Sequence, residues 1–257
     1  MKQSEIFSVL DGYAPFDLSD AFVAAEEDAY DNSGIIIETG KDVKKALFSL
    51  DLSLESAEYA VKGGFDLVVT HHPAVYRPIR RLDLKENRAL TICAASGAGV
   101  ISMHLNLDIA DRGIDHYIAE GLGARDAKII TKIRGENGYG RFFTIEKTTL
   151  KEYKRRISQV FGTDNVMIYG GDGEIEKVAS FCGAGCDMKE LELAEGADAI
   201  VSADFKHHVI SAALDRGYRV IQMTHYASEN YGMKRFYENV KGDLSGVYCE
   251  YFSSDKF

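Results

Sequence analysis

The chain has 257 residues, enough to bury one large core or two smaller ones. Its net charge of −10 excludes a general affinity for nucleic acid, because phosphate groups are repelled on average. Neither a signal peptide nor the roughly 20 apolar residues of a membrane span is present, so we expect no membrane partner and a cytoplasmic location.

Helices and strands are predicted to alternate along the first half of the chain. Residues 65–70 form an unbroken apolar run, which is typical of a strand buried on both faces. Ser53 or Ser56 can cap the helix before it, and Gly63 and Gly64 end that helix. The predictions are helices over 3–12, 54–62, 84–96 and 113–123, a helical turn over 18–28, and strands over 33–40, within 42–53, and over 65–70 and 99–108.

The same alternation continues in the second half. A glycine-rich segment over 133–146 turns into a strand, and the predictions that follow are helices over 150–162, 190–197, 207–217 and 228–240 and strands over 165–171, 177–185, 198–205, 218–226 and 247–252. This order indicates an α/β architecture. Glycine and charge cluster near 126–140, so we expect a first α/β lobe over 1–127 and a second over 128–257.

Two portions of the chain follow one layout. The first reads KGGFDLVVTHHP, then a helix, then GAGVISMHLNLD, and the second reads EGADAIVSADFKHH, then a helix, then RGYRVIQMTHYASE. In each, glycine leads into an aspartate and an apolar strand, and a later strand closes with histidine followed four residues on by an acid. We infer two related α/β lobes with mixed sheets and a metal site between them.

Histidines follow three of the predicted strands. In parallel sheets, ligands gather beyond the carboxyl ends of the strands. An acid four residues after a strand-end histidine can reach the same point from the first turn of a helix. The resulting set is His71, His72, His104, Asp108, His225 and Glu229.

Four imidazoles and two carboxylates suit borderline divalent ions such as Zn, Fe or Mn. They are too many for one tetrahedral site and match two ions that share a bridging carboxylate. A single histidine at a strand end is more often a hydrogen-bonded core residue, but the combined pattern favours two divalent metal ions per chain.

Other candidate residues are less telling. His116 lies on a predicted helix and is read as a packing residue, and His207 and His208 occupy the second copy of the strand end, where they could contact substrate or support ligands with Asp204 and Lys206. Cys182 and Cys186 are two of four scattered cysteines, which fits a reducing compartment better than disulfides or a thiolate metal site.

At these residues the chain resembles the dinuclear-metal-centre, interacting-factor-three-like proteins, also described as type 2 GTP cyclohydrolase I homologues. YDNSGIIIETG, DLVVTHHPAVYRPIRRL, MHLNLDIADRGIDHYIAEGLG, CGAGCD and THYASE are similar to motifs of that family, in the same order. The chain departs from the family at Tyr30, where tryptophan is usual, and at Leu105, Ala203 and His207. The resemblance implies that the six residues bind two metal ions and that the protein is a homohexamer.

Two ions close together are equipment for hydrolysis. We therefore expect a metal-dependent hydrolase that acts on a nucleotide or another phosphorylated small molecule, and we rank the GTP cyclohydrolase-like reaction that the resemblance implies below general hydrolysis. Arg77, Arg80 and Arg81 could meet phosphate or form a solvated loop, and Tyr226 could donate a proton or simply pack. The alternative is a non-catalytic metal-binding scaffold or metal-handling protein with the same ligands.

Overall fold

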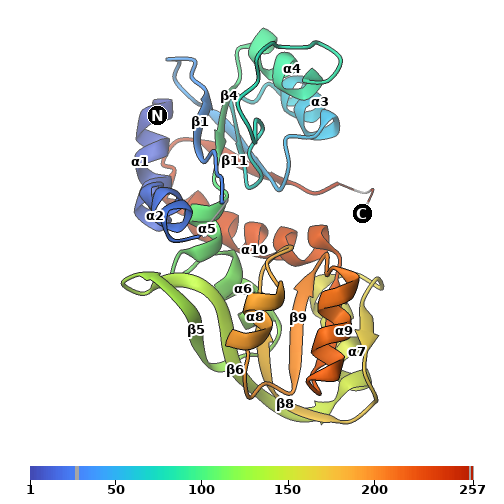
Figure 1. The fold of residues 1–257 in the computed structure, drawn as a ribbon. Helices are drawn as coiled ribbons and strands as arrows, with labels where there is room; N and C mark the ends of the chain where they lie inside the picture. The colour runs from blue at the N-terminus through green and yellow to red at the C-terminus, as the bar shows by residue number, and fades with distance from the viewer. Residues whose placement is uncertain (27–28, 255, 257) are drawn as a thin grey trace. The chain divides into compact units, whose positions relative to one another are not determined.

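The protein divides into two compact units. The computed structural model describes residues 1–26, 29–254 and 256. One unit comprises Met1–Ala110 and Met233–Phe257, and the other comprises Asp111–Gly232. Each contains one mixed sheet with helices packed against it (Figure 1), which confirms the predicted pair of α/β lobes.

The first unit is built on a five-stranded sheet in the order β1-β4-β3-β2-β11. Strands β11, β2, β3 and β4 are parallel, and β1 is antiparallel to β4. Its elements are α1 (Gln3–Tyr13), α2 (Asp17–Ala25), β1 (Gly34–Ile37), β2 (Lys45–Ser49), α3 (Leu54–Gly63), β3 (Leu67–Thr70), α4 (Arg88–Ser96), β4 (Gly99–Ser102), α5 (Leu105–Ile109), η1 (Lys241–Asp243) and β11 (Tyr248–Phe252).

Both faces of the first sheet are covered. Val68 and its neighbours pack against Ala57 of α3 and Cys93 of α4, which lie together beside the sheet in Figure 1. All four residues of β3 are buried, as the apolar run predicts, because helices shield both faces of a parallel sheet. Ser53 caps α3 by accepting from the Ser56 N–H, and Gly64 ends this helix in the left-handed conformation.

The second unit has a six-stranded sheet in the order β5-β6-β8-β9-β10-β7. Figure 1 shows α8 and α9 on one of its faces, where Leu191 and Val209 join the core. Its elements are α6 (Ile114–Gly121), β5 (Arg125–Arg134), β6 (Asn137–Thr149), α7 (Leu150–Phe161), β7 (Met167–Tyr169), β8 (Glu174–Ser180), α8 (Met188–Leu193), β9 (Ala199–Ala203), α9 (His207–Asp215), β10 (Arg219–Met223) and the start of α10 (His225–Val240), which continues into the first unit.

The internal repeat seen in the sequence is a repeat of topology. The order β1-β4-β3-β2 in one sheet matches β7-β10-β9-β8 in the other, each with three parallel strands and an antiparallel neighbour. Asp66 and Asp198 occupy the same place in the two copies. Asp66 Oδ2 accepts from the main-chain N–H groups of residues 44 and 45, and Asp198 Oδ2 accepts from those of residues 176 and 177.

Several predicted boundaries differ from the structure. The strand expected over 99–108 stops at Ser102, because His104 turns the chain into α5. Residues 126–140, expected to separate the lobes, form the β5–β6 hairpin, and β5 was not predicted. The helix expected from 84 begins at Arg88, and the end of the helical turn over 18–28, residues 27 and 28, lies outside the described residues.

The expected division after residue 127 also differs from the observed units. The chain returns to the first sheet at its end, where β11 pairs in parallel with β2. The Tyr237 ring lies 5.3 Å from that of Phe48, and the Tyr237 hydroxyl donates to the Cys249 carbonyl. Phe48 and Tyr237, like β2 and β11, are far apart in sequence, so a local composition change does not report their contact. Within the described part of the chain, no helix has the length and apolar character needed to cross a membrane.

Replacing Asp66 or Asp198 with alanine should lower the free energy of unfolding by about 1–3 kcal/mol, because each change removes two hydrogen bonds from main-chain N–H groups to a charged carboxylate. Urea denaturation followed by circular dichroism measures the effect. The Asp164 side chain is exposed, so Asp164→Ala should change stability by less than about 0.5 kcal/mol. Similar losses in all three variants would show that the two aspartates do not stabilise the fold through these hydrogen bonds.

Candidate metal centre

His71 and His72 lie where the chain leaves β3. Both main-chain N–H groups donate to the Leu50 carbonyl at 3.1 and 3.0 Å, so the chain turns away from the strand direction. The Thr70 hydroxyl donates to the His72 carbonyl and fixes this turn. Adjacent residues of a regular strand point to opposite faces, but this bend brings the two imidazole centres within 4.9 Å.

His104 and Asp108 enter from the end of β4. His104 starts α5, and the Asp108 N–H donates to the His104 carbonyl, so Asp108 lies one turn further on. The His104 ring is 5.3 Å from His71 and 5.8 Å from His72. His71 Nε2 is 3.4 Å from Asp108 Oδ1, and both side chains are buried. The first unit therefore brings together all four of its predicted ligands.

His225 and Glu229 form the corresponding pair in the second unit. They occupy successive turns at the start of α10, directly after β10, and His225 Nε2 is 2.8 Å from Glu229 Oε2. Gly183 faces this pair with φ of +49°, a conformation that favours glycine. A Cβ at Gly183 would lie 2.2 Å from Glu229 Oε1 and 3.1 Å from the His225 ring. The space around these two side chains therefore depends on a glycine.

Every predicted histidine ligand turns its Nδ1 atom toward an oxygen. His71 Nδ1 lies 2.8 Å from the Met103 carbonyl. The other three face carboxylates: His72 faces Asp51 at 2.7 Å, His104 faces Asp31 at 2.7 Å, and His225 faces Asp204 at 2.6 Å. Carbonyl and carboxylate oxygens only accept, so each Nδ1 carries the proton and donates. In the neutral imidazole, the lone pair is then on Nε2.

Two of these Nε2 atoms, on His71 and His225, lie close to a carboxylate oxygen. Between His71 Nε2 and Asp108 Oδ1, and between His225 Nε2 and Glu229 Oε2, two lone pairs approach closely. Such a contact is favourable only when a proton or a metal ion is shared. Two ligands about 2.1 Å from one tetrahedral ion lie about 3.4 Å apart, close to the His71–Asp108 separation. The donor set therefore fits a borderline divalent ion.

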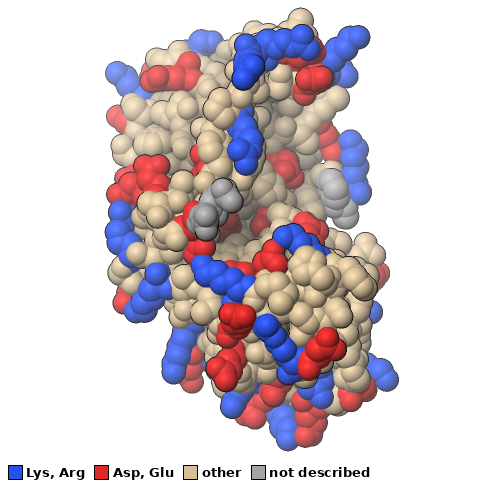
Figure 2. Space-filling view, viewed as in Figure 1, with Lys and Arg blue, Asp and Glu red and all other residues tan. Residues whose placement is uncertain are grey.

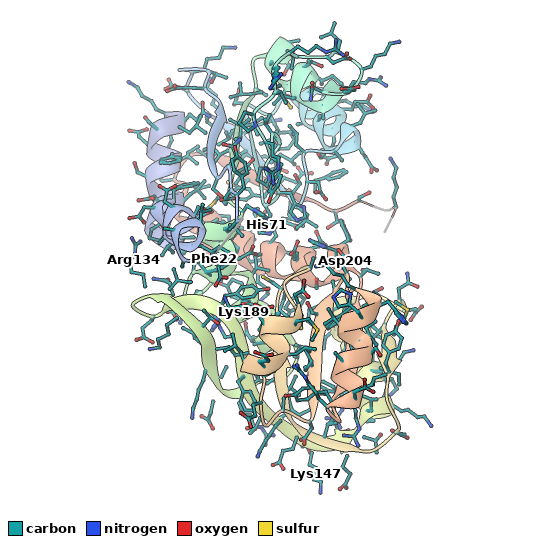
Figure 3. The ribbon with its side chains drawn as sticks, viewed as in Figure 1. Phe22, His71, Arg134, Lys147, Lys189 and Asp204 are labelled. Atoms are coloured by element: carbon teal, nitrogen blue, oxygen red, sulfur yellow. The ribbon has the colours of Figure 1, made fainter. Side chains whose placement is uncertain are left out.

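The three histidines of the first unit could hold a metal ion by themselves. Their candidate ligand atoms all lie within 4.8 Å of one another. Figure 3 labels His71 in this unit and Asp204 in the second. Asp31 is 2 % exposed, and hydrogen bonds from His104, Ser19 and Ser33 outweigh the effect of burial and lower its pKa to about 2. Burial alone would lower the pKa of His104, but Asp31 and Asp108 raise it.

Asp31 and Asp51 were not identified as site residues from the sequence. Asp31 lies in the YDNSG segment and Asp51 lies two residues after β2, both distant along the chain from the histidines they contact. Asp204 was expected near the site, and it contacts His225. Its φ of +47° turns the chain after β9. For Asp51 and Asp204 the available signal was a carboxylate just beyond a strand end, whereas Asp31 precedes β1.

The remaining candidates lie elsewhere or have structural contacts. Lys206 and His208 both approach Asp187, which caps α8. His207 lies at the start of α9 with an exposed side chain. His116 packs edge-on against Tyr117, as a packing residue would. Tyr226 follows His225 in the first turn of α10.

Cys182 and Cys186 are buried, and neither forms a disulfide. Burial raises the pKa of Cys186 far above its ordinary value, so this thiol stays protonated. The main chain around Cys182 is held instead by Asp115 of α6, whose two oxygens accept from the N–H groups of Cys182 and Gly140 at 2.9 and 2.5 Å. Asp115 thereby supports the segment that contains Gly183.

Known proteins with the same architecture are found by sequence and by structure. The model of the family Duf34/NIF3 (NGG1p interacting factor 3) matches residues 1–256. A "GTP cyclohydrolase 1 type 2 homolog" of Methanocaldococcus jannaschii is 29 % identical over 250 residues, which cover 95 % of this chain and 96 % of the relative.

Two solved structures resemble the whole chain. A hypothetical protein of Staphylococcus aureus superposes with a TM-score of 0.87 at 21 % identity, covering 100 % of this chain and 98 % of its own, which shows a shared fold. Reduced HcgD from M. jannaschii superposes with a TM-score of 0.82 at 28 % identity, covering 99 % and 98 %.

The Asp115 carboxyl should make stability depend on pH. Burial raises its pKa from 3.8 to about 6, against the opposing effects of Arg141 and the two main-chain donors. Between these values the folded chain binds more protons than the unfolded chain, so this contribution to stability is present below 3.8 and is lost as pH rises through about 6.

The comparison is between the parent and Asp115→Asn, both treated with chelator and unfolded in urea at a series of pH values. The parent should lose stability relative to Asp115→Asn as pH rises from 3.8 to about 6, and the difference should then level off. A difference that stays constant across this interval, or that changes in the opposite direction, would show that the carboxyl has an ordinary or lowered pKa.

Proposed function

Since the chain belongs to the Duf34/NIF3 family, we propose that it is a dinuclear metal-binding protein and a metal-dependent hydrolase of a nucleotide or another phosphorylated small molecule. The two ions, Zn, Fe or Mn, would be shared by His71, His72, His104, Asp108, His225 and Glu229. The observation that carries this proposal is the common tautomer of the four imidazoles, which leaves the Nε2 lone pair available in each and brings those of His71 and His225 close to buried carboxylates.

The chain's own groups suit this chemistry. When bound, two divalent ions would lower the pKa of water toward about 7 and offset the charge of a phosphate. The carboxylates of Asp51, Asp31 and Asp204 hold three of the imidazoles in orientation and increase their basicity. The carbonyl of Met103 does the same for His71 without adding charge.

Exposure favours a hydrolase over a non-catalytic scaffold. Structural metal sites are usually closed by protein ligands, whereas catalytic sites keep a position open. The side chains of His72 and His225 are 27 % and 33 % exposed, so small molecules could approach them. The scaffold remains the alternative, and turnover distinguishes it.

The name of the M. jannaschii relative suggests a narrower activity, opening of a purine ring. No described side chain of this chain is specific to that reaction, so we propose hydrolysis in general. Assembly into a hexamer and a cytoplasmic location stay predictions from the sequence.

Glu229→Gln should reduce bound metal and hydrolysis together, because an amide oxygen is a much weaker ligand than a carboxylate. Metal content is measured by elemental analysis, and hydrolysis with p-nitrophenyl phosphate and a nucleotide panel in the presence of Zn, Mn or Fe. Glu195→Gln, at an exposed position, is the control. If hydrolysis survived after the metal was lost, the hydrolase proposal would be wrong. Metal binding without turnover on any substrate would favour the scaffold.

The carboxylates behind the imidazoles should control metal affinity. Asp51→Ala and Asp204→Ala should each weaken binding by about 10- to 100-fold, because the imidazole loses the group that orients it. The asparagine variants should lose less, since the amide oxygen still accepts from Nδ1–H. Competition with a chromophoric chelator gives the dissociation constants, and Asp164→Ala serves as the control. Unchanged affinity in both alanine variants would exclude this role.

A further inference from the structure

Arg77 packs against two tyrosine rings, Tyr30 and Tyr76, which also contact each other near a predicted metal ligand. Its guanidinium carbon lies 5.3 Å from the centre of the Tyr30 ring and 5.9 Å from that of Tyr76. The Tyr76 ring in turn meets the His104 ring edge-on, with centres 6.1 Å apart. The Arg77 guanidinium carbon therefore lies no farther from the centre of the His104 ring than the sum of the last two distances.

One short segment positions both this arrangement and His104. Asp31 accepts from His104 Nδ1, and the Ser33 hydroxyl accepts from the His104 N–H. The neighbouring residues of the same segment hold the arginine loop: Asn32 donates to the Val75 carbonyl, and the Tyr76 hydroxyl donates to the Tyr30 carbonyl. The position of Arg77 relative to His104 is therefore built into the first unit.

Arg77 differs from the other arginines of its loop. Arg81 pairs with Asp83 at 3.6 Å. For Arg80, no ring contact or ion pair is found with the described residues. Contact with two rings restricts where the Arg77 guanidinium can lie, and its planar N–H donors match the geometry of a phosphate. Arg77 is thus positioned by its neighbours as well as charged.

The surroundings are basic although the chain is acidic. Residues 77–88 contain Arg77, Arg80, Arg81, Lys85 and Arg88 but only Asp83 and Glu86 as acids, in a chain of net charge −10. Figure 2 shows basic side chains, in blue, over the part of the first unit where α4 and the segment before it lie. This local charge favours an anion at a site that the remainder of the surface would repel.

We propose that Arg77, packed against the rings of Tyr30 and Tyr76, binds a phosphate of the substrate. This phosphate is separate from the group held at the metal ligands, and we call these three residues the bracket. This inference rests on the proposed function, because it assumes that the hydrolysed substrate carries a phosphate that is used for recognition. The bracket favours substrates that carry a phosphate in addition to the group held at the metal ligands, such as nucleotides, because only these can engage both positions.

Binding of GMP and of guanosine to chelator-treated protein tests the bracket without the metal centre, with isothermal titration calorimetry as the readout. The parent should bind GMP at least tenfold more tightly than guanosine. Arg77→Gln should weaken GMP binding by about 10- to 100-fold and leave guanosine unchanged, since a charge-assisted pair of hydrogen bonds is lost. Arg77→Lys, which keeps the charge without the planar donors, should fall between.

Arg80→Gln is the matched control, because it removes the same charge from the same loop and should change GMP affinity less than about twofold. Equal losses in the Arg77 and Arg80 variants would replace the bracket with general electrostatic attraction and overturn the proposal. It is also overturned if the parent does not bind GMP or if Arg77→Gln binds it normally.

Metal analysis separates this inference from the proposed function. Arg77→Gln should keep the parent's metal content, whereas Glu229→Gln should lose metal and still bind GMP after chelation. If the parent shows no turnover, the hydrolase proposal fails. GMP binding by Arg77→Gln still decides whether Arg77 forms an anion site. Loss of metal from Arg77→Gln would assign Arg77 a structural role and overturn the inference.

Discussion

The hydrogen bond from imidazole Nδ1 to a fixed oxygen is the interaction on which the candidate centre depends. It is made by His71, His72, His104 and His225, through one carbonyl and three carboxylates. Each bond fixes the tautomer and the direction of the ring at once, so Nε2 presents its lone pair before any ion arrives. The cost of arranging the ligands is thereby met during folding. The same bonds also give each Nδ1–H donor an acceptor where the parallel strands end.

The fold supplies these bonds because parallel strands end at one edge. In the first unit, β2, β3 and β4 lie in register, and the residues just beyond them include Asp51, the double histidine and His104. In the second unit, β9 and β10 end beside each other in the same way and lead to Asp204 and His225. A carboxylate and an imidazole from neighbouring strands therefore meet in both copies of the repeat. The repeated topology explains why similar chemistry occurs twice in the chain.

The sequence predicted what local patterns encode. Apolar runs gave β3 and β9, and glycine gave the end of α3, because strand burial and helix capping depend on neighbouring residues. The histidines were recognised because they follow such strands. Asp31 and Asp51 were missed because their partners are 73 and 21 residues away along the chain. The return of β11 to β2 was missed for the same reason, and with it the division of the chain.

The CGAGC segment affects the candidate site through a glycine rather than through its cysteines. Its cysteines were expected to be reduced thiols rather than metal ligands, and both are buried, with burial keeping Cys186 protonated. Its glycine at 183 has the closer relation to the ligands, since any side chain there would overlap the Glu229 carboxylate. The Gly183 carbonyl accepts from the Ser202 hydroxyl and the Ala203 N–H, and Asp115 holds the preceding residue. A backbone clamped on both sides leaves room for Glu229 only if that residue has no side chain. The segment therefore acts on the site through its main chain, and a change of one methyl group at 183 would alter the ligand geometry more than loss of either thiol.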